Sequence, residues 1–130
     1  MSNSVVLVAG RALLSAVFLV AGVRKIMIWG TQVAYFTKLG FPMPEVMTVL
    51  AIAIELGAGL ALLAGWRTRQ AAWLLALFVL IATLMAHRFW EFDAAQQANQ
   101  MNHFLKNLAI IGGLAFVASF GPGRAALDKT

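Results

Sequence analysis

The sequence predicts an all-α integral membrane protein, a four-helix bundle with a short interfacial helix between the first two spans. Of its 130 residues, 62% are hydrophobic and only 12% are charged, whereas soluble domains have about 45–50% apolar and about 25% charged residues. So few polar side chains cannot cover a water-soluble globule of this size. The apolar residues are also gathered into long segments, each near the roughly 20 residues that cross a bilayer as a helix.

Charge and cysteine content narrow the chemistry and the partners. The chain contains no cysteine, so it offers no disulfide framework, no thiolate metal site and no cysteine-held iron–sulfur cluster. Its formal net charge is +5, but the basic residues are scattered and form no run. We therefore expect the lipid bilayer as a partner, and no nucleic acid.

The predicted spans cover residues 5–23, 46–64, 70–86 and 104–120, and we take them as one transmembrane domain over residues 1–130. The first span could instead be a signal peptide, but the pattern fits poorly. No basic residue precedes Val5, and Arg11 falls inside the apolar stretch, which is longer than the usual hydrophobic region. We expect this segment to be retained as a helix.

The first connection, residues 24–45, mixes aromatic and basic side chains, a composition typical of the membrane interface. Thr31 is the expected N-cap of a short helix that ends at Gly40. Pro42 and Pro44 then stop any continuation. This segment is the predicted interfacial helix.

The other two connections carry turn and capping signals. Residues 65–69 form a tight turn between the second and third spans. Asp93 followed by Gln96 is a capping pair, so we expect a helix that begins near Ala94 and continues into the fourth span.

Basic residues on the two sides of the membrane indicate the orientation. An even number of spans places both termini on one side, together with Arg67, Arg69, Arg124 and Lys129. The opposite side holds Arg24, Lys25, Lys38 and Arg88. The count is four against four, or four against three if Lys25 packs inward. Because basic residues are enriched on the cytoplasmic side, we expect cytoplasmic termini.

Charged side chains inside the spans are the candidate functional residues. Arg11, Glu55 and Lys106 lie where a charge costs at least about 2.5–3.5 kcal/mol, so we expect them to face the bundle interior and to pair there. Glu55 lies near the middle of its span. Arg11 and Lys106 are long enough to reach towards it from different depths, which predicts an interior network of the three.

Further polar residues lie at the span ends. His103, Lys106 and Asn107 share one helix face at positions i, i+3 and i+4. His87 ends the third span on the same side of the membrane as His103, and Lys25 ends the first span. Lys25 is either a snorkelling anchor or part of the interior set.

The interior set has a functional and a structural interpretation. Arg11, Lys25 and Lys106 against Glu55 give an excess of two positive charges, which suits an anion or a polarised carbonyl. The structural interpretation is an ion-pair network that only fixes the register of the helices. No flavin, haem or metal motif is visible, although two histidines on facing helices are able in principle to ligate haem.

Small residues recur every fourth position in the second span, at Ala53, Gly57, Ala61 and Gly65. Such a stripe lets two helices approach closely. Glu55 lies on a different face at about 100° per residue. We therefore expect this helix to pack through one face and to carry its charge on another.

Short motifs along the whole chain resemble those of the DoxX family. They are Gly10-Arg11, Gly22-x-x-Lys25, Leu39-Gly40-x-Pro42-x-Pro44, Glu55-Leu56, His87-x-Phe89-Trp90, the run from Met101 to Asn107 before Gly112-Gly113, and Phe120-Gly121-Pro122-Gly123. The resemblance is to the small bacterial inner-membrane members, and it implies a four-helix protein of the inner membrane. The family takes its name from a subunit of a thiosulfate:quinone oxidoreductase, and other members are linked to membrane oxidoreductase complexes.

Two functions from different classes follow. The first is a quinone-linked redox subunit that acts on a small anionic or sulfur-containing donor. In it Glu55, Lys106 and His103 are the catalytic residues, and Arg11, Asn107, His87 and Lys25 bind the substrate.

The alternative is a non-catalytic scaffold, which binds a partner oxidoreductase subunit or a second copy of the chain through the stripe of small residues. A small-anion transporter is a third class, but no broken helix or inverted repeat supports it.

Overall fold

The structure is a computed structural model that describes residues 3–128, so Lys129, counted above for the orientation, lies outside the described residues. These residues form five α-helices and one short 3₁₀ turn. They are α1 (Asn3–Met27), α2 (Trp29–Lys38), α3 (Pro44–Ala64), α4 (Thr68–Ala86), η1 (Phe89–Glu91) and α5 (Ala94–Phe120). Four segments of the described chain are long and apolar enough to cross a membrane. The predicted all-α fold with four spans is confirmed.

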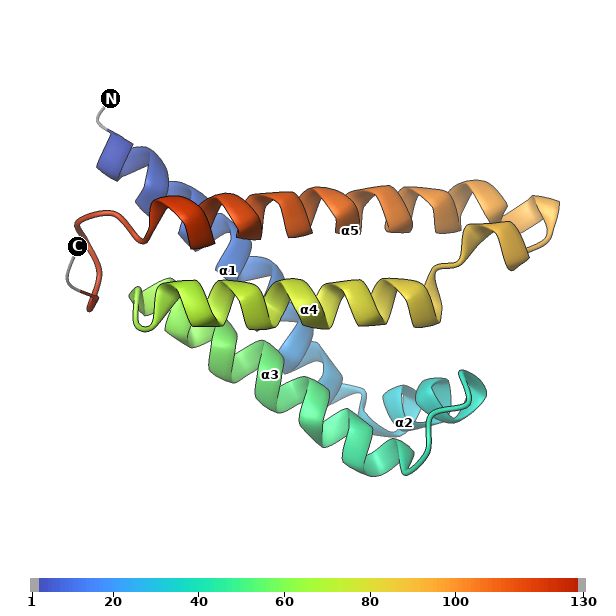
Figure 1. The fold of residues 1–130 in the computed structure, drawn as a ribbon. Helices are drawn as coiled ribbons and strands as arrows, with labels where there is room; N and C mark the ends of the chain where they lie inside the picture. The colour runs from blue at the N-terminus through green and yellow to red at the C-terminus, as the bar shows by residue number, and fades with distance from the viewer. Residues whose placement is uncertain (1–2, 129–130) are drawn as a thin grey trace.

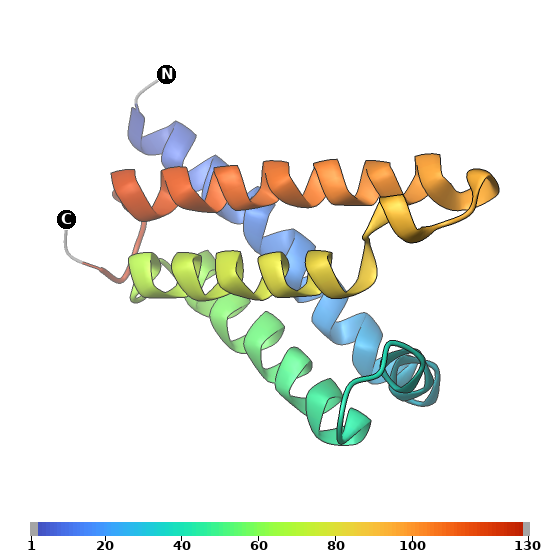
Figure 2. The same ribbon diagram turned by 45° about the vertical axis from the view of Figure 1, so that its right-hand side comes forward.

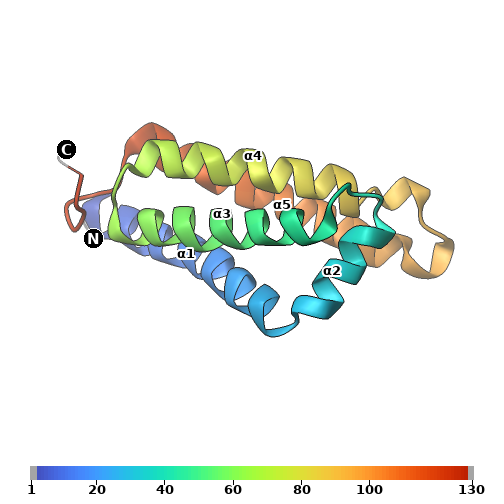
Figure 3. The same ribbon diagram turned by 90° about the horizontal axis from the view of Figure 1, so that it is seen from below.

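The helices form two antiparallel pairs that diverge towards one end. α4 lies beside α5, while α1 packs against α3, and the second pair turns away from the first (Figures 1 and 2). Both termini and the turn between α3 and α4 lie at one end, the termini end. The short helix α2 and the turn η1 lie at the opposite end, the α2 end (Figure 3). The divergence leaves α2, α3 and α4 around a common space.

Local signals set most of the helix boundaries. Pro44 occupies the first turn of α3, where its missing N–H costs nothing. Gly65 ends α3 with φ +70°, a conformation that glycine adopts without strain. Asp93 accepts a 3.1 Å hydrogen bond from the N–H of Gln96, so the predicted cap and the start of α5 at Ala94 are confirmed.

The predicted cap of the interfacial helix is wrong. α2 begins at Trp29, two residues before Thr31, and no side chain caps it. Ile28 donates to the carbonyl of Arg24 and accepts from the N–H of Gln32, each at 2.9 Å. The hydrogen bonds of α1 therefore lead almost directly into α2. Thr31 therefore lies inside the helix, where no helix N-terminus needs its hydroxyl as a cap.

The close contact between α1 and α3 depends on glycines outside the predicted stripe. A Cβ on Gly22 would lie 2.7 Å from the Leu56 side chain, and a Cβ on Gly59 would lie 3.1 Å from Leu19. Ala53 and Gly57 are instead exposed. The expectation that this helix packs through one face and carries its charge on another is wrong within the described chain, because α3 buries the face that carries Glu55.

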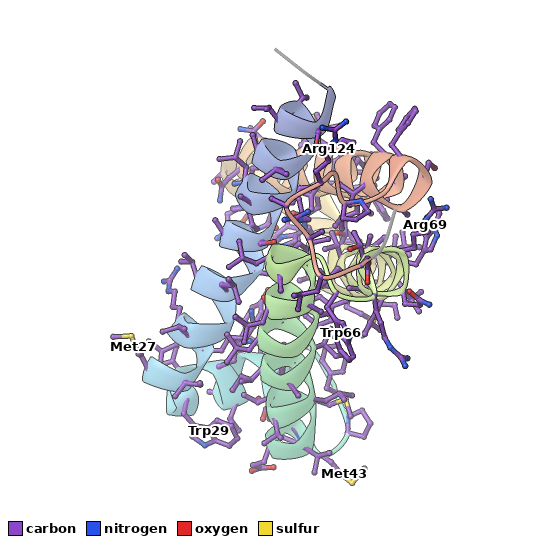
Figure 4. All side chains as sticks on the ribbon, turned by 90° about the vertical axis from the view of Figure 1, so that its left-hand side faces the viewer. Met27, Trp29, Met43, Trp66, Arg69 and Arg124 are labelled. Carbon is purple, nitrogen blue, oxygen red and sulfur yellow. The ribbon has the colours of Figure 1, made fainter. Side chains whose placement is uncertain are left out.

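The segment after α5, residues 121–128, folds back across the termini end, and we call it the C-terminal strap. The Arg11 guanidinium donates to the carbonyls of Pro122 and Ala125. The strap also pairs with the end of α3, where the N–H of Asp128 donates to Gly65 at 2.7 Å. Figure 4 looks onto this end and labels Arg124 in the strap, with Trp66 and Arg69 near it. The strap thus joins α1 to α3 and α4.

Asp128 caps the start of α4. Its two carboxylate oxygens accept from the N–H groups of Arg67 and Thr68, both at 2.7 Å. The nearby Thr68 side chain and these two backbone N–H groups stabilise the ionised carboxylate and lower the pKa of Asp128 from its usual value. The carboxylate therefore keeps its charge, and its caps, to a lower pH than an unpaired aspartate does.

We predict that Asp128→Ala lowers the unfolding free energy at pH 7 by about 1 kcal/mol, the usual loss for a helix cap. Because the folded-state pKa of Asp128 is lowered, its contribution is fully present above its unfolded pKa of about 3.9 and disappears as the pH falls through the folded value. Unfolding of the detergent-solubilised protein between pH 7 and pH 3 measures this. Glu45→Ala, at an exposed position, is the control. A difference between wild type and Asp128→Ala that does not shrink on acidification contradicts the account.

Candidate functional site

The space between α2, α3 and α4 is an apolar groove of about 550 Å³ at the α2 end. Aliphatic side chains of α3 and α4 form most of its wall, and aromatic residues of the first connection close it on one side. Four polar residues reach it. They are Lys25, Gln32, Tyr35 and His87. A volume of about 300–1,000 Å³ with an apolar lining and few polar groups is typical of a small-molecule site.

A buried ion pair lies at the wall of this groove. Nζ of Lys25 is 2.6 Å from Oε1 of Glu55, and the Glu55 side chain is only 4% exposed. Lys25 also lines the groove. The ammonium is thus held between a buried carboxylate on one side and an apolar cavity on the other.

The motif Gly22-x-x-Lys25 explains how the pair forms. A Cβ on Gly22 would lie 2.7 Å from the Leu56 side chain, next to Glu55, so a small residue there lets α1 approach α3 at this level. Lys25 follows three residues later, near the end of α1, and lies on the same face about one turn on. Of the two interpretations of Lys25, the structure supports the inward-packed one. Arg24 is exposed.

Two histidines, which the sequence places on the same side of the membrane, contact each other beside the groove. The rings of His87, after α4, and His103, on α5, stack with centroids 4.9 Å apart. Nδ1 of His87 lies 2.7 Å from Oε1 of Gln100. This hydrogen bond between the imidazole and the side-chain amide holds the orientation of the His87 ring.

Asn107 and Lys106 are adjacent in sequence but have different surroundings. Asn107 donates to the Thr83 hydroxyl at 2.9 Å, and Thr83 in turn donates to the Val79 carbonyl. Asn107 therefore ties α5 to α4. Lys106 is exposed on α5 and does not line the groove. The expectation that Lys106 faces the bundle interior is wrong.

The predicted network of Arg11, Glu55 and Lys106 is not present. Arg11 is buried, as expected, with 3% exposure, but it bonds to the C-terminal strap. It lies 14 residues before Lys25 on the same helix, which is about 21 Å along the axis. The buried charges therefore occupy two separate places. The excess of two positive charges does not belong to a single cavity.

Several groove residues were not identified as site residues from the sequence. Tyr35, Phe36 and Phe41 were assigned to the headgroup level, yet they line the groove, and their rings contact one another in sequence order. Gln100, which orients His87, carries no local signal. The spacing of Gly22 and Lys25 is the one sequence signal for this site, because it marks the place where α1 comes close to α3.

The fold defines a small multi-pass membrane protein with an apolar groove at one end of its helices. The family model described as DoxX matches residues 6–88, and the chain belongs to the DoxX family. It is similar to inner membrane protein YphA of Escherichia coli strain K12, with 30% identity over 128 residues that cover 98% of this chain and 91% of that protein. It is also similar to inner membrane protein YqjF of the same organism, with 36% identity over 124 residues, 95% of this chain and 89% of that protein.

No solved structure matches the chain. Both relatives are inner membrane proteins, in agreement with the location that the sequence resemblance implies. The matched region ends within the turn after α4, so it contains Lys25, Glu55 and His87, whereas His103 and Lys106 lie beyond it.

We predict strong coupling between Lys25 and Glu55. Removing one partner of a buried ion pair leaves the other charge unpaired, so Lys25→Met or Glu55→Gln should each lower the unfolding free energy by about 3–5 kcal/mol. The double variant Lys25→Met/Glu55→Gln should lose much less than the sum of the two single losses. Lys106→Met, at an exposed lysine, should change stability by less than about 1 kcal/mol. Thermal unfolding of the wild type and these four variants measures the coupling, and additive losses contradict it.

Proposed function

We propose that this protein is a quinone-linked redox subunit of the bacterial inner membrane, and that the groove binds the quinone ring. The observation that carries the proposal is a large apolar groove with one lysine ammonium at its wall, that of Lys25, which pairs with the buried carboxylate of Glu55. A quinone needs an apolar groove for its ring and a hydrogen-bond donor for its carbonyl oxygens. The proposed donor is a small anionic or sulfur-containing molecule, which acts directly or through a partner oxidoreductase subunit.

The residues present fit a quinone. Bound there, a quinone would take two electrons from the donor and two protons, and leave as the quinol. The Lys25 ammonium is a donor for a carbonyl oxygen, and its positive charge stabilises negative charge that develops on that oxygen. Glu55 holds the ammonium in place and takes part in proton exchange with it.

His87 is the second proton-handling group in this proposal. It lines the groove, and the Gln100 contact fixes the ring orientation. The ring of His103 stacks on the ring of His87, so the two histidines form one polar cluster beside the groove. We assign proton exchange with water to His87 and His103 together, since an imidazole both donates and accepts protons.

The remaining predicted site residues receive different roles in the proposal. Lys106, exposed on α5 one turn from His103, is proposed to attract the anionic donor, because a lysine on a span can extend its ammonium towards the interface. Asn107 positions α5 through Thr83. Arg11 has no role at the groove, because it is bonded to the strap at the other end.

We further propose that both termini are cytoplasmic. Lys25 is paired inside the protein, so the basic residues left at the α2 end are Arg24, Lys38 and Arg88. The sequence places four basic residues at the termini end. The excess favours a cytoplasmic termini end. The groove then opens near the periplasmic face.

We predict that a short-chain benzoquinone raises the thermal midpoint of the wild-type protein, because a ligand that binds only the folded state stabilises it. Ala82→Phe places a ring in the groove and should abolish the rise. Ala109→Phe, the same substitution at an exposed site of α5, should leave the rise unchanged. Differential scanning fluorimetry in detergent measures all three. No rise in the wild type, or an equal rise in Ala82→Phe, contradicts the quinone site.

The alternative, a non-catalytic scaffold, is favoured by a different observation. The face of α3 that carries Ala53 and Gly57 is exposed, and a Cβ on Gly57 would have nothing within 4 Å among the described residues. A stripe of small residues facing lipid is the kind of surface through which membrane helices associate.

The scaffold alternative predicts that Gly57→Leu reduces the solubilised complex to the mass of the single chain without lowering the thermal midpoint. Gly112→Leu on α5, where a Cβ would also have open space, is the matched control and should keep the assembly. Native electrophoresis after mild solubilisation reports the mass. An unchanged complex in Gly57→Leu excludes this face as the assembly surface.

A further inference from the structure

A second cavity, of about 380 Å³, lies at the termini end, away from the groove. Two arginines from the start of α4, Arg67 and Arg69, line it together with Phe120 from the end of α5 and with the strap. Arg69 lies over the strap, since its Nη2 would be 3.7 Å from a Cβ on Gly121. The cavity is therefore built from three chain segments, which are the start of α4, the end of α5 and the strap.

The backbone of Arg67 is in a conformation that arginine rarely adopts. Its φ is +47°, in the left-handed region that favours glycine. The N–H bond to Asp128 needs only the backbone, so a glycine would serve it equally well. Non-glycine residues kept in this region cluster at ligand sites. The strained backbone therefore indicates a role for the Arg67 side chain. Its guanidinium carbon lies 5.2 Å from the centroid of the exposed Trp66 ring.

The charge of the cavity suits a monoanion. Arg67 and Arg69 contribute two positive charges and Asp128 one negative charge. Both oxygens of Asp128 already accept backbone N–H groups. Among residues 3–128 the salt bridges are Lys25–Glu55 and Arg88–Glu91, so neither arginine of the cavity is paired with a carboxylate. A net charge of +1 remains for a ligand.

Aromatic rings continue from the cavity along the outside of α5. The rings of Phe116 and Phe120 stack with centroids 6.1 Å apart, and the two residues are 66% and 68% exposed. Such rings belong in the membrane rather than in water. A ligand with one negative charge and an apolar chain would meet arginines at its head and these two rings along its chain.

We propose that this cavity binds the phosphodiester group of an anionic membrane phospholipid, with the phosphate between Arg67 and Arg69 and an acyl chain along Phe116 and Phe120. Guanidinium groups bind phosphate oxygens in a fork geometry that an ammonium does not offer. The site is independent of the quinone groove, because it lies at the opposite end of the helices. It would hold the termini end at the headgroup level of one leaflet.

The test compares phospholipids added to the purified protein in a neutral detergent. Phosphatidylglycerol should raise the thermal midpoint, and phosphatidylcholine should raise it markedly less. Arg67→Gly should fold, because glycine adopts the same backbone conformation and keeps the N–H bond, yet it should lose the phosphatidylglycerol effect. Arg69→Gln should lose it as well.

Two controls separate the guanidinium from its surroundings. Met43→Gly relieves the other left-handed non-glycine residue among those described, at φ +48°, and should keep the response. Arg88→Gln removes an arginine at the α2 end and should also keep it. An equal response to phosphatidylcholine, or a full response in Arg67→Gly, overturns the proposal. An equal rise with free glycerol 3-phosphate overturns the membrane lipid as the source of the phosphate.

Discussion

The ion pair between Lys25 and Glu55 is the constraint on which the α2 half of the molecule depends. A carboxylate in the middle of a membrane helix must find a partner or a proton, and here the partner comes from the last turn of α1 at 2.6 Å. Gly22 permits that approach. Since α1 then ends against α3, α2 is placed beside α3, opposite α4. The groove and the Lys25 ammonium at its wall are thus consequences of a single contact.

The two ends of the molecule deal with buried charge in different ways. At the α2 end, Lys25 pairs with Glu55 beside an apolar groove. At the termini end, Arg11 donates to backbone carbonyls of the strap, and Asp128 accepts from the N–H groups at the start of α4. The second arrangement closes the bundle with hydrogen bonds to the main chain, and Arg11 does not line the cavity described at this end. The different surroundings explain why we assign ligand chemistry to Lys25 and a structural role to Arg11.

Much of the fold follows from the sequence, because hydropathy and caps are local properties. The spans, the cap at Asp93 and the burial of Arg11 and Glu55 were predicted correctly. The partners of those charges were not. The position of a residue along a span gives its depth, but how far each helix is rotated depends on packing. Lys106 therefore turned out to be exposed. The acceptors of Arg11 are more than 100 residues away in a segment without periodicity.

Covalent mapping tests the central claim, that the groove beside Lys25 and Glu55 binds a quinone. A photoreactive azidobenzoquinone is irradiated with the purified protein, and the labelled residues are identified by mass spectrometry. The account predicts labels on groove residues of α3 and α4, such as Met47, Ile54 and Phe78, and their loss when an unlabelled quinone competes. Labels confined to the exposed face of α5, for instance at Leu105 and Phe116, with no effect of the competitor, would contradict it.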